Sequence, residues 1–232
     1  MRHLLLALAL WLSFTTPAWA VPAFSVTAAV TWAFGGASNS ATRTIPTADS
    51  VYLACTWVDA TGDSLASTIA AASPTDSFQT IANESEKTYF AVYIAAPSGS
   101  QTVAVSGADA GDETSCGFRG LDDIDTTTPW DGEVSDTTTP ASISVVTTAD
   151  GLAVGGVFAE DTTAATSDTQ VFEGAETASG FVINVASTPG TGGTVSIDWT
   201  NIFNSSVAAN MRAAAAPPGG APPTRTLLGV GQ

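Results

Sequence analysis

Carboxylates make up most of the chemically capable side chains in this 232-residue sequence. It holds 22 aspartates and glutamates against six lysines and arginines, two cysteines and one histidine, His3. His3 lies in a leader-like segment, and without it a Ser-His-Asp triad, a histidine-bound zinc and a histidine general base are excluded. The single lysine, Lys87, and two cysteines that can pair leave little for Schiff-base or thiol chemistry. The sequence therefore predicts a protein that is not an enzyme.

The densest acidic stretch runs from Gly120 to Asp125 and holds Asp122, Asp123 and Asp125. Oxygen-only clusters of this kind suit calcium, which is the one cofactor that the sequence suggests. The stretch continues into three threonines, without the glycine and closing glutamate of an EF-hand loop. An ordinary solvated acidic loop fits the same residues, so both interpretations stay open.

A second acidic group follows at Asp131 and Glu133, next to Trp130. Two carboxylates that flank a glycosidic bond can hydrolyse it, and an aromatic ring such as Trp130 could stack on the sugar. A glycoside-active enzyme is therefore one alternative function. Only the residue types support this enzymatic alternative, and an ordinary surface turn would have the same composition.

The first twenty residues resemble a secretory signal peptide. Arg2 precedes an apolar run from Leu4 to Phe14, and the segment ends in the small-x-small motif Ala18-Trp19-Ala20. The apolar run is too short to span a bilayer, so no transmembrane segment is expected. Cleavage after Ala20 would predict a secreted protein, whereas a retained leader would be an apolar assembly arm.

The charge balance narrows the choice of partners. The formal net charge is −16, so the protein repels nucleic acid and anionic membrane surfaces. Such a charge favours binding of divalent cations or basic partners. The alternative is that the charge only keeps the protein soluble. No nucleic-acid partner is expected.

Period-two alternation of apolar and polar residues predicts strands along most of the chain, beginning with residues 24–34. Turn-forming residues separate the further candidates, which are 42–45, 51–58, 78–82, 88–95, 102–106, 114–119, 142–147, 152–158, 170–172, 181–186, 194–199 and 206–212. A short helix over Asp63–Ala72 is a weaker possibility. Many short strands predict an all-β fold, a two-sheet antiparallel β-sandwich of jelly-roll type. No repeat of 20–50 residues is evident.

Cys55 and Cys116 are expected to form a disulfide. Cys55 shares one face of its strand with Leu53 and Trp57, and Cys116 shares a face with Phe118. Neighbouring strands could bring the two sulfur atoms together, which would stabilise an exported protein by roughly 4 kcal/mol in the chain-entropy model. Two buried free thiols are the alternative.

The aromatic residues divide into core and candidate surface. Trp32, Trp57 and Trp199 occupy alternating strand positions and are expected in the core. Tyr89 and Tyr93 share one face of their strand, and a half-buried strand would expose that face for ligand stacking or subunit contact. If both sheet faces are covered, the tyrosines are buried instead.

The C-terminal segment 213–232 differs from the rest. Ala213–Pro223 is rich in alanine, proline and glycine and is typical of a flexible linker. Leu227, Leu228 and Val230 beyond it are apolar side chains that could dock on a neighbouring subunit. The predicted organisation is a leader over 1–20, a β-sandwich domain over 21–212 and this tail.

The segment Ser115–Asp122, continued by Thr128–Asp131, resembles a group of β-sandwich modules in phage and prophage virion and tail proteins and in secreted bacterial surface proteins. In those modules a strand ends in an aromatic-Arg-Gly-Leu-Asp turn, as at Phe118–Asp122 here, and a Pro-x-Asp step follows. A later strand pair resembles Ser144–Val154. The resemblance covers the order of elements from Ala41 to Ala215, and it transfers no catalytic residue.

This resemblance implies a non-enzymatic structural or decorating protein of a virion or similar surface assembly. Its expected partners are copies of itself or neighbouring virion or surface proteins, and a cell-surface glycan is a further candidate. A retained leader would place it on a virion surface, and a cleaved leader outside the cell. A secreted adhesin or carbohydrate-binding module is the main alternative.

Overall fold

The structure is a computed structural model that describes residues 20–58, 64–80, 86–107, 109, 112–137, 142–160, 168–199 and 205–215. The predicted leader, apart from Ala20, and the apolar tail residues Leu227, Leu228 and Val230 lie outside the described residues. The described part of the chain contains no helix, and therefore none that is long and apolar enough to cross a membrane.

The described residues form sixteen strands, and every pairing between them is antiparallel. The strands are β1 (Ala23–Phe24), β2 (Val30–Gly35), β3 (Ser38–Ile45), β4 (Ser50–Val58), β5 (Ala66–Ile69), β6 (Asp76–Gln79), β7 (Glu86–Ile94), β8 (Gly99–Ser106), β9 (Glu113–Asp122), β10 (Trp130–Asp136), β11 (Ser142–Val146), β12 (Leu152–Glu160), β13 (Thr169–Glu173), β14 (Phe181–Pro189), β15 (Thr194–Asp198) and β16 (Ser206–Met211). The predicted all-β sandwich is confirmed.

Two local differences have physical causes. The single strand expected over residues 24–34 is two strands, β1 and β2, and between them Val26 is fully exposed. The segment with a weak helical pattern contains β5 instead. Ser67 and Ile69 of β5 both face the core, so the short element follows period two and pairs with β8.

The first half of the chain, β1–β9, builds a large sheet and a small one. The large sheet has the order β1-β9-β4-β7-β6, with β2 also paired to β9, and the small sheet has the order β3-β8-β5. Leu53 and Trp57 of the large sheet and Val103 and Val105 of the small sheet belong to one buried cluster. The small sheet therefore covers the outer face of the large one.

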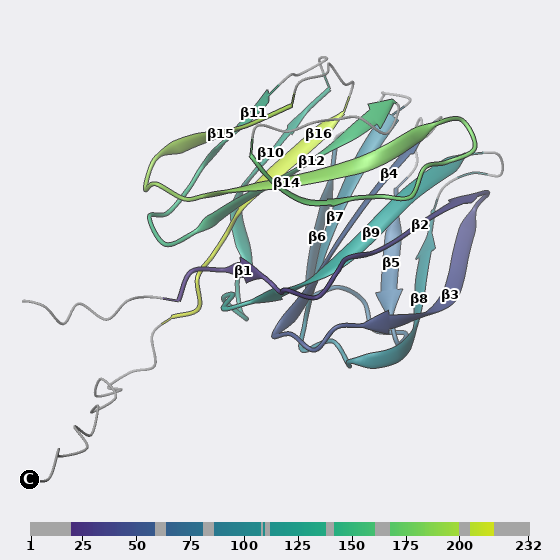
Figure 1. Ribbon diagram of the computed structural model, residues 1–232, viewed down its shortest axis with the longest axis horizontal. Helices are drawn as coiled ribbons and strands as arrows, with labels where there is room; N and C mark the ends of the chain where they lie inside the picture. The colour runs from purple at the N-terminus through teal and green to yellow at the C-terminus, as the bar shows by residue number, and fades with distance from the viewer. Residues whose placement is uncertain are drawn as a thin grey trace, which may run out of the picture.

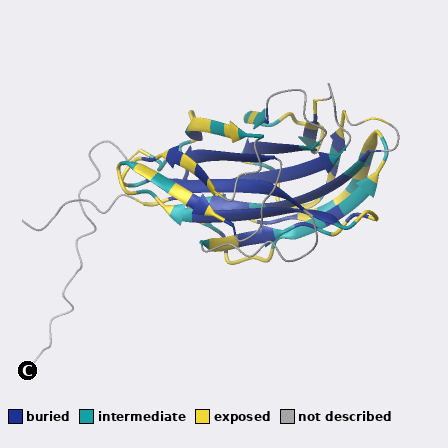
Figure 2. Cartoon of the chain, turned by 90° about the horizontal axis from the view of Figure 1, so that it is seen from above, coloured by how far each residue is buried: buried dark blue, intermediate teal, exposed yellow. Residues whose placement is uncertain are grey.

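The second half, β10–β16, repeats this plan. Its large sheet has the order β10-β16-β12-β14-β13, and β11 and β15 form its small sheet. Ile143 and Ile197 of the small sheet pack on Val157 and Ala208 of the large sheet. A third cluster, which includes Phe90 and Val185, joins the two large sheets face to face. The molecule is thus a stack of four sheet layers, with the buried strands in the middle (Figures 1 and 2).

Each half has jelly-roll connectivity, because its strands pair as nested hairpins. In the first half β2 pairs with β9, β3 with β8 and β4 with β7. In the second half β10 pairs with β16, β11 with β15 and β12 with β14. The equivalent strands also take the same order in the two large sheets. The chain is therefore an internally duplicated jelly roll.

Individual backbone hydrogen bonds recur at equivalent places. Thr80 N donates to Thr88 O in the first half, and Gly174 N donates to Ile183 O in the second. The first bond lies where β6 meets β7, and the second lies at the equivalent place, where β13 meets β14. Across the interface β7 packs on β12 and β16, while its equivalent β14 packs on β4 and β9. This reciprocity is the pattern of an isologous two-fold contact.

Candidate functional site

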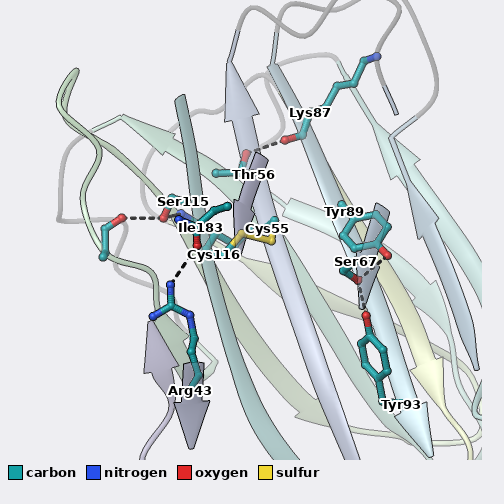
Figure 3. Close-up of a disulfide and its surroundings, with 12 residues drawn as sticks. Arg43, Cys55, Thr56, Ser67, Lys87, Tyr89, Tyr93, Ser115, Cys116 and Ile183 are labelled. Carbon is teal, nitrogen blue, oxygen red and sulfur yellow. Dashed lines mark hydrogen bonds between the residues drawn. A yellow bond between two sulfur atoms is a disulfide. The ribbon is translucent and has the colours of Figure 1, made fainter. Parts of the chain in front are cut away.

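Cys55 and Cys116 are joined by a disulfide inside the first-half core (Figure 3). They are directly opposite each other on β4 and β9, and both are fully buried. Leu53 and Phe118, each two residues away from its cysteine and on the same face of the sheet, form the next cross-strand pair. The pairing of β4 with β9 therefore continues past the disulfide. The bond ties the middle of the large sheet and leaves no free cysteine.

Tyr89 and Tyr93 are not a surface, so the prediction of an exposed binding face is wrong. Each is only 3% exposed, because β3, β8 and β5 cover that face of β7. The hydroxyl of Ser67 lies 2.9 Å from the Tyr89 hydroxyl and accepts a 2.6 Å hydrogen bond from Tyr93 (Figure 3). Burial raises the pKa of both phenols, and the bonds to Ser67 partly oppose it. The hydroxyl cluster therefore holds the small sheet in place.

Trp130 is likewise buried, at 2% exposure, which corrects its assignment as a binding surface. Its ring meets Phe78 edge to face at 5.1 Å in the cluster between the two large sheets. The predictions for Trp32, Trp57 and Trp199 are confirmed, since all three are buried. None of the predicted stacking aromatics is free for a sugar.

Two of the three carboxylates proposed for calcium, those of Asp122 and Asp125, accept hydrogen bonds from the protein backbone. Asp122 accepts a hydrogen bond from Asp49 N, and Asp49 accepts one from Asp123 N. Asp125 accepts bonds from Thr127 N and Thr128 N, and these backbone amides lower its pKa. Among the described residues, no group of three or more His, Cys, Asp or Glu side chains is arranged to hold a metal ion. Asp122 therefore holds the turn that leads into β4, and Asp125 caps the turn between the two halves, before β10.

Asp131 and Glu133 lie on β10, at the irregular step in its pairing with β16. Asp131 accepts a 2.8 Å hydrogen bond from the Asn210 side chain and lies 3.9 Å from Arg212. Glu133 is exposed. Because the Trp130 ring points into the core, these two carboxylates have no stacking platform beside them.

A hollow with an apolar floor lies at the opposite end of the strands, and sequence analysis missed it. One part, of about 270 Å³, is lined by Phe34 of β2, Glu113 of β9 and residues 176–178. The other, of about 540 Å³, is lined by Phe158, Phe181, Glu86 and Glu176 among others. Glu176 borders both parts, so we treat them as one feature and call it the end groove. Nothing in the spacing of these residues marks them, because the two halves contribute them from distant strands.

Glu113 fixes the loop between β13 and β14 at the end groove. Its carboxylate accepts hydrogen bonds from Ser179 N at 2.9 Å and Ser179 Oγ at 3.1 Å. The Ser179 amide and the Thr177 side chain lower the pKa of Glu113. In contrast, burial and the nearby Glu176 carboxylate raise the pKa of Glu173. Glu113 is thus held by the loop, whereas Glu173 and Glu176 lie close enough for their carboxylates to repel each other.

The Glu113 clamp predicts a pH-dependent stability difference. Its pKa in the folded protein lies below the ordinary value of 4.5, so its contribution is present above that pH and is lost as pH falls through the folded pKa. Glu113→Gln should therefore be less stable than wild type to urea at neutral pH, and the difference should shrink as the pH falls below 4.5. The exposed Glu133→Gln serves as control. A difference that persists unchanged in acid would contradict the clamp.

The outer faces of the two small sheets carry mainly hydroxyl groups. In the first half the exposed side chains alternate along β3 and β8 and include Ser40, Thr42 and Thr102. In the second half Ser144 and Thr194 occupy the equivalent strands β11 and β15. The exposed positions of both faces together are Ser38, Ser40, Thr42, Thr44, Ala66, Ser100, Thr102, Ser106, Ser142, Ser144, Val146, Thr194, Ser196 and Asp198. We call these the outer faces, and Asp198 is the one charged residue among them.

Comparison with protein-family models, with curated proteins and with solved structures finds no match to this chain. The fold and its surfaces therefore carry the functional argument.

Proposed function

We propose that the protein is a non-enzymatic structural or decorating component of a surface assembly, such as a phage virion, and that it packs against copies of itself or neighbouring proteins through its outer faces. The observation that carries this proposal is the pair of outer faces on opposite sides of the four-layer stack. The virion setting rests on the resemblance of Ser115–Asp131 to phage and prophage modules. With a cleaved leader the same module would work outside the cell.

The distribution of charge supports contact through these faces. With a net charge of −16, copies of the protein repel each other wherever their carboxylates meet. Asp198 is the one acidic residue among the exposed positions of the outer faces, while other acidic side chains of the described residues lie at strand ends and loops, as at Asp122 and Glu176, or on β10. Burying a face with so few charges requires little desolvation of ionised groups. The faces are therefore where two copies can meet at the lowest electrostatic cost.

The edges of the small sheets support the same proposal. β3 is an edge strand of its sheet, and β11 and β15 form a two-stranded sheet. Edge strands present unpaired backbone groups to which another chain can add a strand. A charged side chain on an edge strand can discourage pairing with another chain. The Arg43 side chain of β3 is instead stacked on Trp32, with its Cζ atom 4.2 Å from the ring centroid. Face packing and edge pairing can thus reinforce each other.

Lysine substitutions on the outer faces test this function. Thr42→Lys with Ser144→Lys places one long charged side chain on each outer face. We expect self-association, measured by sedimentation velocity, to weaken about tenfold, which corresponds to about 1.4 kcal/mol. Thr126→Lys with Thr169→Lys adds the same charge at exposed positions outside the faces and should leave association unchanged. Equal behaviour of the two double variants would reject the outer faces as contact surfaces.

A further inference from the structure

The end groove combines an apolar floor with an acidic rim. Its accessible apolar lining is the half-buried Phe34 of the first half with Ala33 and Ala178, while Phe158 and Phe181 of the second half, whose rings lie 5.1 Å apart, are buried beneath it. Glu86 and Glu176 lie along its border. A fitting ligand would therefore pair a cation with adjacent apolar side chains.

Basic side chains within the fold are already engaged. The described ones and their partners are Arg43 over Trp32, Lys87 over Trp57, Arg119 with the carbonyl oxygens of Ser25 and Val171, and Arg212 with Asp125 and Asp131. Beyond Ala20 this leaves Arg225 as the remaining cation of the sequence. It is followed closely by Leu227, Leu228 and Val230, which is the composition that the end groove fits.

The geometry favours a partner copy over the same copy. Ala214 N donates to Asp123 O, so the described chain ends beside the C-terminal end of β9, near β1 (Figure 1). The end groove includes Glu113, at the other end of this 10-residue strand, a distance of about 30 Å. The stretch from Ala215 to Arg225 covers at most about 35 Å when fully extended. Since the path must also pass around the sandwich, docking on a second copy is favoured.

We infer that the segment Thr224–Gln232 of one copy binds in the end groove of a second copy, with Arg225 at Glu176 and the leucines on the apolar floor. The contact joins two different surfaces, the tail of one copy and the groove of another, so it can close as a reciprocal pair or continue from copy to copy. It adds a second kind of contact to the proposed assembly, and it does not use the outer faces.

A peptide titration tests this inference on the full chain. A fluorescein-labelled peptide with the sequence of Thr224–Gln232 should bind saturably in an anisotropy assay and weaken as salt rises. Glu176→Arg in the protein should weaken binding about tenfold, and a peptide carrying Arg225→Glu should restore it. Glu133→Arg, the matched change on β10, should bind the unmodified peptide normally. A peptide with Leu227→Asp and Leu228→Asp should not bind.

The result separates this inference from the proposed function. The Thr42→Lys with Ser144→Lys protein should bind the peptide as wild type does, even though its self-association weakens. Absence of saturable binding, or equal binding by wild type and Glu176→Arg, would overturn the docking of the tail. Circular dichroism of each variant checks that the fold is retained, and Glu176 is exposed, so its replacement should not disturb folding.

Discussion

Replacing both Cys55 and Cys116 by alanine is expected to lower the free energy of unfolding by about 4 kcal/mol. The disulfide closes a loop with a sequence separation of 61, and its loss restores conformational entropy to the unfolded chain. Domains of this kind have about 5–15 kcal/mol in total, so the variant loses a large share of its stability. For a chain of this size the melting temperature should fall by about 8–16 °C.

Urea unfolding of the double alanine variant measures the effect directly. Wild-type protein unfolded with and without reductant provides the control, because reduction breaks the bond but keeps both sulfur atoms. The two comparisons should agree if loop closure dominates. A double variant within about 1 kcal/mol of wild type would show that the bond between β4 and β9 contributes little beyond the strand pairing itself.

Phe90→Ala is the second substitution with a large expected effect, a loss of about 3–5 kcal/mol. Phe90 is fully buried between the two large sheets, with the rings of Tyr52 and Phe78 at 5.0 Å and 5.5 Å. Its ring occupies the space above Gly156 of β12, where an added Cβ would lie 2.6 Å from Phe90 Cε1. The ring and the glycine therefore form one interlocking contact between the two halves.

A double-mutant cycle isolates this contact. Gly156→Ala alone should cost about 1–3 kcal/mol through overpacking against Phe90. In the Phe90→Ala background the same change fills vacated space, so its cost should vanish or reverse. Gly155→Ala, which faces Ile197 and Trp199 in the other core, gives a control that Phe90→Ala should not rescue. Additive effects of Phe90→Ala and Gly156→Ala would mean that the halves do not interlock here.

Alternation along the strands was enough to predict the fold class, but not how many faces are covered. Val51, Leu53, Cys55 and Trp57 face one side of β4 while Tyr52 and Ala54 face the other, and all of them are buried. The pattern therefore predicts the strand correctly. Burial of both faces depends on sheets contributed by distant segments, which alternation within one strand does not encode.

The errors at the candidate site have the same origin. A half-buried strand would expose the face of Tyr89 and Tyr93, but β7 is covered on both faces, and Ser67 of β5 supplies the hydrogen bonds that permit burial of the two hydroxyls. β5 lies in the segment with a weak helical pattern, so this partner could not be recognised. Trp130 is similar, since its neighbour in the core, Phe78, is far away in sequence.

The duplication was also missed, although the sequence holds faint signs of it. Thr-Ala-Asp precedes both β4 and β12, at residues 47–49 and 148–150. Phe78 and Phe172 occupy equivalent strands and both face the central cluster. Ser115 accepts a hydrogen bond from Ile183 N, and Ser205 lies 3.1 Å from the Thr88 hydroxyl, again across the halves. A search for periods of 20–50 residues does not detect a repeat of roughly twice that length.

The most direct test of the proposed assembly function is sedimentation velocity of the full chain over a range of protein concentrations at moderate salt. We predict that the weight-average sedimentation coefficient rises with concentration, because the outer faces bring copies together in spite of the net charge of −16. A coefficient that stays at the value of a 23.3 kDa monomer at every concentration would contradict an assembly that this protein forms with itself.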